Sequence, residues 1–231
     1  MTGVPLLVLD LDNTLIDRAG ALRRWAAGFA AQAGASAADV EWLVREDRDG
    51  LEPRDRLAAK VRQRLALTTG QQAMLLAELR RGFAQYTELD PAVPNALDLA
   101  RRAGWVPVVL TNGTVYQQEL KLRHTGLDRH VAGWVISEEA GTRKPDPAIF
   151  QLAAQRASLE LAGAWMIGDS AEADIAGAQA AGISSTWLHR QRTWSRAGFR
   201  PTRIADTCTA AITSVAQSPP VIGSPRQGTA N

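Results

Sequence analysis

The chain has 231 residues, enough for one sizeable domain or for a core with a smaller insert. Its 45% hydrophobic and 22% charged residues are typical of a globular protein and exclude a disordered or fibrous chain. The net charge is only +2, and the arginines are spread along the sequence, so the charge pattern does not indicate a nucleic-acid partner.

The compartment is indicated by cysteine content and by hydropathy. The single cysteine, Cys208, excludes an internal disulfide and suits a reducing compartment. The N-terminus lacks the basic region of a signal peptide, and no apolar run approaches the ~20 residues of a membrane helix. We therefore expect a cytoplasmic protein that does not contact a membrane, with a monomer as the default.

The first third of the chain predicts one strand and then a helical insert. The apolar run Val4–Leu9 is typical of a buried strand. From about Ala19 to Tyr86 there is no strand pattern, and turn residues separate several amphipathic segments. The periodicity predicts three or four helices in this insert, at Ala21–Ala33, Ala37–Arg45, Arg54–Leu65 and Gln71–Tyr86.

Beyond residue 90, short apolar runs alternate with helical patterns. The predicted strands are Val106–Leu110, Gly133–Ile136, Ala164–Ile167 and Ser184–Leu188. The predicted helices are Asn95–Ala103, Val115–Arg123, Pro147–Arg156 and Ile175–Ala181. This alternation, with strands apolar on both faces, indicates an α/β fold with a doubly wound, Rossmann-like parallel sheet. We expect a core formed by residues 1–17 and 90–216, an all-helical cap at 18–89, and a disordered tail at 217–231.

Polar side chains lie directly after the predicted strands, where doubly wound sheets bind their ligands. They are Asp10, Asp12, Thr111, Asn112, Lys144, Asp169 and Asp174. Four clustered carboxylates repel one another, and Lys144 alone does not offset them. A hard divalent cation with oxygen ligands does, and no His or Cys cluster competes for a softer metal, so the sequence predicts a Mg²⁺ site and phosphate chemistry.

The spacing of Asp10 and Asp12 is compatible with two different roles. One carboxylate can act as a nucleophile held at the metal, and the other can donate a proton. Thr111 and nearby backbone N–H groups are placed to hydrogen-bond phosphoryl oxygens, while Lys144 neutralises charge. Which aspartate takes which role is left open by the spacing alone.

Taken together, these segments resemble the four ordered motifs of the haloacid dehalogenase superfamily. The matching segments are Asp10-Leu11-Asp12-Asn13-Thr14-Leu15, Leu110-Thr111-Asn112-Gly113, Lys144-Pro145 and Gly168-Asp169-Ser170 through Asp174. The helical insert after the first motif resembles the C1-type cap of the subgroup that contains phosphoglycolate phosphatases. The resemblance covers nearly all of the chain except its tail.

The resemblance implies a role for each matching residue. Asp10 matches the nucleophile and a metal ligand, and Asp12 matches the general acid and base, whose backbone carbonyl also binds the metal. Thr111 and Asn112 match phosphate-binding positions. Lys144 matches the residue that steadies the nucleophile and the phosphate, and Asp169 matches a metal ligand. Asp174 matches a second acid, which in some members does not contact the metal directly.

We therefore expect a Mg²⁺-dependent phosphatase that hydrolyses a small-molecule phosphate monoester through a phospho-aspartate on Asp10. A phosphomutase uses the same motifs and is an alternative. A 2-haloacid dehalogenase is a further one, although its superfamily members lack an acid at the position of Asp12 and need no metal. A non-catalytic binding module usually loses the nucleophile or the second acid, and this chain keeps both.

Specificity is expected in the cap, because the motif residues recognise only the phosphoryl group. Arg23, Arg24 and Arg54 are candidates to bind an anionic part of the substrate, although arginines on helices are more often solvated. Trp194 is a candidate to flank the site. His189 follows the fifth strand and is a candidate to approach the site, although the expected chemistry does not need a histidine.

Overall fold

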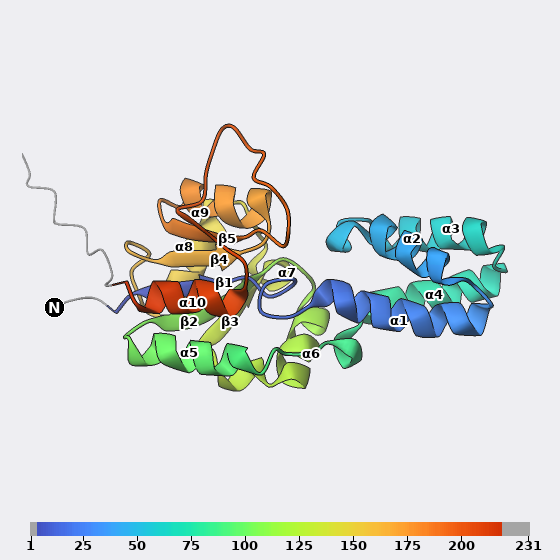
Figure 1. Ribbon diagram of the computed structural model, residues 1–231, viewed down its shortest axis with the longest axis horizontal. Helices are drawn as coiled ribbons and strands as arrows, with labels where there is room; N and C mark the ends of the chain where they lie inside the picture. The colour runs from blue at the N-terminus through green and yellow to red at the C-terminus, as the bar shows by residue number, and fades with distance from the viewer. Residues whose placement is uncertain (1–3, 219–231) are drawn as a thin grey trace, which may run out of the picture.

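The computed structural model describes residues 4–218, which form one parallel sheet with helices on both faces and a separate group of helices at one side (Figure 1). The sheet has six strands in the order β3-β2-β1-β4-β5-β6. Their bounds are β1 Leu6–Leu9, β2 Val106–Thr111, β3 Gly133–Ile136, β4 Trp165–Gly168, β5 Ser184–Leu188 and β6 Arg203–Ala205. The order reverses on either side of β1, so β1 lies at the topological switch point where such sheets bind ligands.

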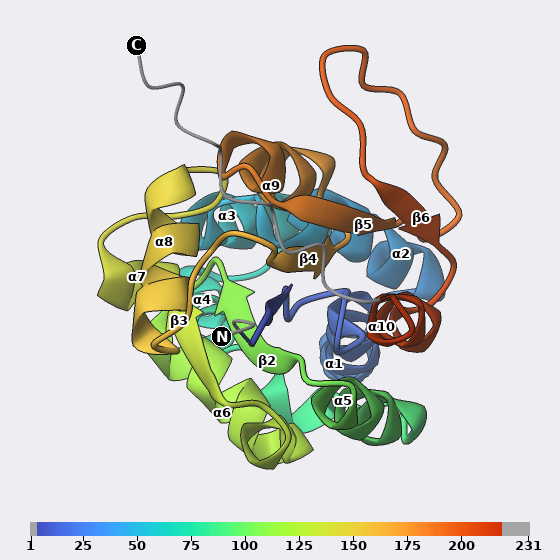
Figure 2. The same ribbon diagram turned by 90° about the vertical axis from the view of Figure 1, so that its left-hand side faces the viewer.

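Alternate side chains of β1 enter two different apolar layers. Leu7 and Leu9 pack in the layer of α5 (Ala92–Arg102), α6 (Val115–Thr125) and α10 (Cys208–Ala216). Leu6 and Val8 pack on the opposite face, with α8 (Pro147–Arg156) and α9 (Ala176–Ala180). All four side chains are fully buried, as expected for a strand covered on both faces. Figure 2 shows α8 and α9 on one side of the sheet and α5 and α10 on the other.

The fold predicted from the sequence is confirmed. The five predicted strands are all present, and each differs from its predicted bounds by two residues or fewer. Apart from short 3-10 turns, three elements escaped prediction, namely β6, α10 and the short helix α7 (Ser137–Ala140). The edge strand β6 pairs only with β5 and exposes Ile204, so it has neither the length nor the apolar run of the inner strands. The predicted helix Ile175–Ala181 starts earlier, as a π-helical turn at Ala171–Ile175 that leads into α9.

Four helices form the cap, beside the sheet (Figure 1). They are α1 Arg18–Ala33, α2 Ala37–Asp47, α3 Arg54–Leu65 and α4 Thr69–Arg81, and they share an apolar cluster of their own. Capping boxes begin two of them: Ser36 caps α2 with Asp39, and Thr68 caps α4 with Gln71. The last cap helix, α4, ends earlier than predicted, at Arg81 instead of Tyr86. Gly82 follows it with a positive φ, which ends the helix.

The chain leaves and re-enters the core at neighbouring points. Ile16, just before α1, forms an isolated antiparallel bridge with Leu89, which lies after the last cap helix. Asp17 caps α1 by accepting a hydrogen bond from the backbone N–H of Gly20. The domain boundaries predicted at 17/18 and 89/90 stay a prediction, and they lie close to this crossing.

The C-terminal part of the described chain is anchored on the sheet. Gln217 and Ser218 continue the hydrogen bonding of α10, and the Ser218 hydroxyl accepts a hydrogen bond from Arg203 of β6. The rest of the tail that was predicted to be disordered, from residue 219 on, lies outside the described residues. Within residues 4–218, none of the helices combines the length and the apolar character needed to span a bilayer.

Candidate active site

A cavity of about 850 Å³ lies at the carboxyl ends of the central strands. All seven residues singled out in the sequence line it, and cap residues complete its wall. The core contributes residues that follow β1, β2 and β4, together with the segment before α8. The cap contributes Arg18, the turn Arg48–Leu51, Arg54 and Arg80. The long segment 189–202 between β5 and β6, which extends away from the sheet in Figure 2, contributes Arg192 to Arg196.

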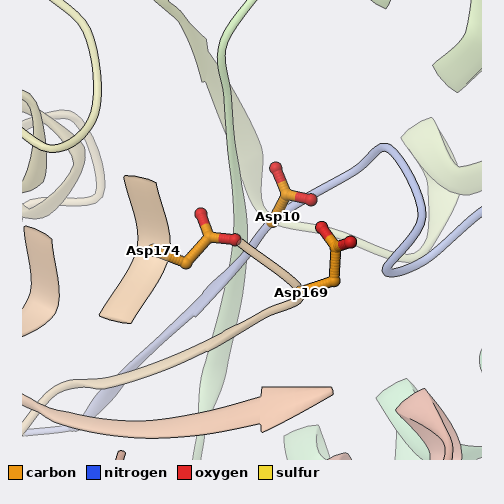
Figure 3. A group of neighbouring side chains, drawn as sticks. All are labelled: Asp10, Asp169 and Asp174. Carbon is orange, nitrogen blue, oxygen red and sulfur yellow. The ribbon is translucent and has the colours of Figure 1, made fainter. Parts of the chain in front are cut away.

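Three buried carboxylates converge at the base of this cavity (Figure 3). Asp10 follows β1, Asp169 follows β4, and Asp174 lies in the π-helical turn after Asp169. Each of them offers one oxygen, and these three oxygens lie within 4.8 Å of one another. The backbone N–H of Ser170 donates to Asp174 Oδ2 at 2.9 Å, which fixes the direction of that carboxylate. A side chain at Gly168 would collide with it, because a Cβ there would lie 2.2 Å from Asp174 Oδ2.

One buried lysine lies against the three acids. Lys144 Nζ is 2.7 Å from Asp10 Oδ1 and 2.8 Å from Asp174 Oδ1, and it also donates to the carbonyl of Leu110 at 2.6 Å. The carboxamide of Asn112 holds the backbone of Lys144 through two hydrogen bonds of 3.0 Å, one donated and one accepted. The position of the ammonium is therefore fixed from both ends of the lysine.

The charges in this cluster are poorly balanced. Burial raises the pKa of Asp10 to about 8, with Asp174 and Asp169 adding to the rise against the opposing charge of Lys144. Burial also raises the pKa of Asp169 to about 6, helped by Asp174 and opposed by Arg190 and Arg192. Burial alone would lower the pKa of Lys144, but Asp10 and Asp174 raise it above its ordinary value. The cluster thus favours bound positive charge, supplied by protons or by a cation.

This donor set fits a hard divalent cation. Asp10, Asp169 and Asp174 present only oxygen ligands, and they converge from three directions on one small space. A cation there would relieve the repulsion that raises the pKa values of Asp10 and Asp169. The carboxylate of Asp12 does not belong to this group, so any metal contact from Asp12 would come from its backbone carbonyl.

The Asp12 side chain instead lies against α6. Lys121 Nζ is 2.8 and 2.7 Å from its two carboxylate oxygens, and Gln118 Nε2 donates to Oδ2 at 3.1 Å. Burial would raise the pKa of Asp12, but the charges of Lys121 and Arg18 lower it below its ordinary value. Gln118 and Lys121 were not predicted from the sequence. A signal for them was present in the sequence. Gln118 and Lys121 are polar residues three apart, so they lie on one face of the predicted helix that follows Thr111.

Thr111 and Asn112 differ in the groups that they leave free. The Thr111 hydroxyl accepts a hydrogen bond from Gln118 and still has its own proton to donate. Asn112 uses both the oxygen and the nitrogen of its carboxamide on the backbone of Lys144. Its side chain therefore supports Lys144, and the donors that Asn112 leaves free for a phosphate are its backbone N–H and the second N–H of its carboxamide.

Asp169 has two arginine neighbours that the sequence analysis also missed. Arg190 Nη1 and Arg192 Nη2 lie 3.2 and 3.1 Å from Asp169 Oδ2, and Arg192 also donates to the Asp169 carbonyl at 2.6 Å. Both arginines follow β5 directly, so including the end of the fifth strand among the candidate positions would have found them. Trp187, at the end of the same strand, donates from its indole N–H to the Asp169 carbonyl at 2.8 Å.

The other candidates separate into residues that line the cavity and residues that do not. Arg54 and Trp194 line it. Arg23 forms an exposed ion pair with Glu41 and is not among the lining residues. Two further candidates have partners elsewhere: Arg24 donates to the Tyr86 carbonyl, and His189 pairs with Asp206.

Comparison with known proteins agrees with this geometry. A family model described as haloacid dehalogenase-like hydrolase matches residues 4–182. The chain is 31% identical over 232 residues to phosphoserine phosphatase from Thermus thermophilus, covering 85% of this chain and 90% of that protein. It is 35% identical over 118 residues to pyrimidine 5'-nucleotidase YjjG from Escherichia coli, covering 50% of this chain and 52% of that protein.

A solved structure extends the similarity to the whole fold. The magnesium-bound YfnB hydrolase from Bacillus subtilis is 22% identical, with a TM-score of 0.70 over 94% of this chain and all of that one. Dehalogenases also occur among the similar proteins. The match of the family model and the identity to the Thermus enzyme lead to one assignment. The chain belongs to the family of haloacid dehalogenase-like hydrolases and is a hydrolase.

Proposed function

We propose that the protein is a Mg²⁺-dependent phosphatase that hydrolyses a small phosphate monoester through a phospho-aspartate on Asp10. The observation that carries the proposal is the contact of Asp10 with Lys144, within a cluster of three carboxylates at the switch point of the sheet. The similarity to phosphatases supports the same reaction class. We assign the helical insert to the C1 type and the chain to the phosphoglycolate-phosphatase-like subgroup as part of this proposal.

In the first step, a carboxylate oxygen of Asp10 attacks the phosphorus, and the ester P–O bond breaks as the Asp10 O–P bond forms. Lys144 holds the attacking carboxylate in place and offsets phosphoryl charge. The Thr111 hydroxyl donates to a phosphoryl oxygen. Asp10, Asp169, Asp174 and the Asp12 backbone carbonyl would hold Mg²⁺, which would supply charge stabilisation for the phosphoryl group.

Asp12 moves the protons in both steps. It donates a proton to the oxygen of the leaving alcohol, and it later accepts one from the water that attacks the phospho-aspartate and breaks the Asp10 O–P bond. Its lowered pKa keeps it charged in the free enzyme, as the second role requires. The first role requires the protonated form, which the negative phosphate of a bound substrate favours, because a like charge raises the pKa of a carboxyl group.

Asp12 also separates this proposal from the alternatives. A displacement of halide from carbon needs no proton donor for its leaving group, whereas an alkoxide leaving group does. Asp12 is held by two side chains of α6 beside the cavity, as a proton donor must be. We therefore prefer a phosphatase to a dehalogenase. A phosphomutase would use the same residues, and it differs in returning the phosphoryl group to a second hydroxyl instead of to water.

The test is phosphate release from a panel of phosphorylated metabolites, with and without Mg²⁺. Asp10→Asn should abolish release and leave the circular-dichroism spectrum unchanged, whereas the matched control Asp55→Asn, on the exposed surface of α3, should retain full activity. Rapid quenching with a ³²P-labelled ester should leave label on the wild-type protein and none on Asp10→Asn. Halide release from a 2-haloacid without phosphate release from any ester would contradict the proposal.

A further inference from the structure

A buried charge cluster forms the part of the cap that faces the cavity. Asp47, the last residue of α2, is completely buried. Arg18 Nη1 and Nη2 lie 2.7 and 3.1 Å from its two carboxylate oxygens, and Arg54 Nη1 lies 2.5 Å from Oδ1. The backbone N–H of Gly50 donates to Oδ2 at 2.8 Å, which ties the adjoining turn to the same carboxylate. Asp47 therefore positions two guanidinium groups at the cavity wall.

The cluster has more positive than negative charge. Asp47 offsets one of the two arginines, and a second buried cation without an anion is costly. The other carboxylates on this side have cations of their own: Asp12 pairs with Lys121, and Asp49 lies 3.8 Å from Arg190. Arg18 and Arg54 therefore share the single charge of Asp47, and Arg54 has no other carboxylate within 4 Å among residues 4–218, so its positive charge faces the cavity without a second partner.

The guanidinium of Arg54 is the group best placed to present that charge. Its side chain is 21% exposed, compared with 6% for Arg18. Among residues 4–218, its only hydrogen bond uses Nη1, so Nε and Nη2 are free to donate. Both arginines line the same cavity as Asp10 and Lys144.

The cluster lies on the side of the cavity that holds the proton donor. Asn13, the residue after Asp12, accepts a hydrogen bond from the backbone N–H of Ala19 at 2.9 Å and donates one to Asp49 at 3.0 Å, which joins the start of α1 and the cap turn to this strand end. Asp12, Lys121, Arg18 and Arg54 all line the same cavity. Because Asp12 protonates the leaving oxygen in the proposed reaction, groups close to the Asp12–Lys121 pair surround the leaving alcohol. The surplus charge is thus next to the part of the substrate that the phosphate-binding residues do not contact.

We infer that Arg18 and Arg54 bind an anionic group, a carboxylate or a second phosphate, that is carried by the leaving alcohol of the substrate. This inference rests on the proposed function. The guanidinium is suited to the task because its planar donors match carboxylate and phosphate oxygens. Asp47 is a positioning residue, because it acts by aligning the two arginines. The substrate class is therefore a small phosphate monoester with a second acidic group.

The test compares matched pairs of esters that differ only in that group. One pair is carboxymethyl phosphate and its carboxamide, and the other is propane-1,3-diol bisphosphate and 3-hydroxypropyl phosphate. For at least one pair, the wild-type kcat/KM should favour the anionic member by about tenfold or more. The pair that shows the preference tells whether the group is a carboxylate or a phosphate.

Variants then locate the preference. Arg54→Met should reduce the ratio of the two kcat/KM values by about tenfold to a hundredfold, because it removes charged hydrogen bonds to one member only. Arg54→Lys keeps the charge but loses the planar donors, so it should give an intermediate ratio. Arg23→Met, in the same cap but outside the cavity, is the matched control and should keep the wild-type ratio. Turnover of the neutral member reports that each variant is folded.

Each adverse outcome has a distinct meaning. Equal kcat/KM values within both pairs would overturn the inference, as would a ratio that Arg54→Met leaves unchanged. Hydrolysis of phenyl phosphate together with no turnover of either anionic ester would also overturn it, while the proposed function would stand. The absence of phosphate release from every ester would instead overturn the proposed function itself.

Discussion

Lys121 lies 109 residues from Asp12 in the sequence, yet its ammonium contacts both oxygens of the Asp12 carboxylate. The pair is completed by Gln118, which donates to Asp12 and to the Thr111 hydroxyl and accepts from Lys121. One helix, α6, thus sets the orientation of the proposed acid–base residue and of a proposed phosphate-binding hydroxyl. The proton-transfer and phosphate-binding parts of the site are physically connected.

We expect Lys121→Met to lower kcat by about tenfold to a hundredfold, a large part of what a positioned general acid and base contributes. Loss of the ammonium also raises the pKa of Asp12, because the main opposing charge is gone while burial remains. The acidic limb of the pH profile of kcat should therefore move to higher pH. Lys60→Met, which removes a half-buried cap lysine outside the cavity, is the control. An unchanged kcat and pH profile would remove Lys121 from this role.

The stability of the metal-free protein should decrease as the pH rises from about 4 to about 8. The pKa values of Asp10 and Asp169 are raised from 3.8 to about 8 and about 6, so the folded state binds more protons than the unfolded state in this window. The free energy of unfolding then falls with pH, according to proton linkage. Lys144, with its raised pKa, stays charged throughout and does not change the sign.

Thermal melts in EDTA between pH 5 and pH 8 would measure this dependence. The melting temperature should fall with pH, and added Mg²⁺ should raise it more at pH 8 than at pH 5, because the cation replaces bound protons. Asp10→Asn should flatten the slope, since it removes the group with the largest upward shift. A melting temperature that rises across this range in EDTA would contradict the prediction.

Gly168→Ala should reduce turnover by about a hundredfold or more. A Cβ at this position would lie 2.2 Å from Asp174 Oδ2, so the carboxylate would have to move away from Ser170 and Lys144. The matched control is Gly133→Ala in β3, where a Cβ would meet nothing within 4 Å. Circular dichroism and phosphate release on both variants would separate a local effect from a general loss of folding. Equal activity of the two variants would show that Asp174 can be displaced without consequence.

Cys208 should be inert to thiol reagents in the native protein. It is buried at the start of α10, and burial, together with the negative charges of Asp10 and Asp90, raises the pKa of its thiol to about 12. The thiolate that reacts is therefore scarce at pH 8. Titration with a chromogenic disulfide should give no signal in buffer and one equivalent in guanidinium. A full equivalent within seconds under native conditions would contradict the burial of this residue.

The sequence was sufficient for five of the six strands, the cap helices and the residues that follow β1, β2 and β4. These were accessible because buried parallel strands are continuous apolar runs and their ends converge at one edge. Gln118, Lys121, Arg190 and Arg192 were missed for a different reason. Long polar side chains on helices and in loops are usually solvated. The packing of α6 and of segment 189–202 against the core directs these four side chains into the site instead.

The π-helical turn at Ala171–Ile175 was missed because a π turn has no composition of its own. A π turn contains one residue more than an α-helical turn. In this turn the carboxylate of Asp174 accepts a hydrogen bond from the backbone N–H of Ser170. The sequence therefore predicted that Asp174 belongs to the site, but not how it is held.

The bridge between Ile16 and Leu89 has a consequence for how this protein could be rebuilt. The two ends of the insert are neighbours in the core. The free-energy cost of bringing them together therefore depends little on the length of chain between them. The entropy of closing a loop grows only slowly with loop length. The insert can therefore be exchanged for a shorter, longer or differently shaped one without altering the strand pairing of β1, which makes this crossing a natural site for grafting new recognition elements.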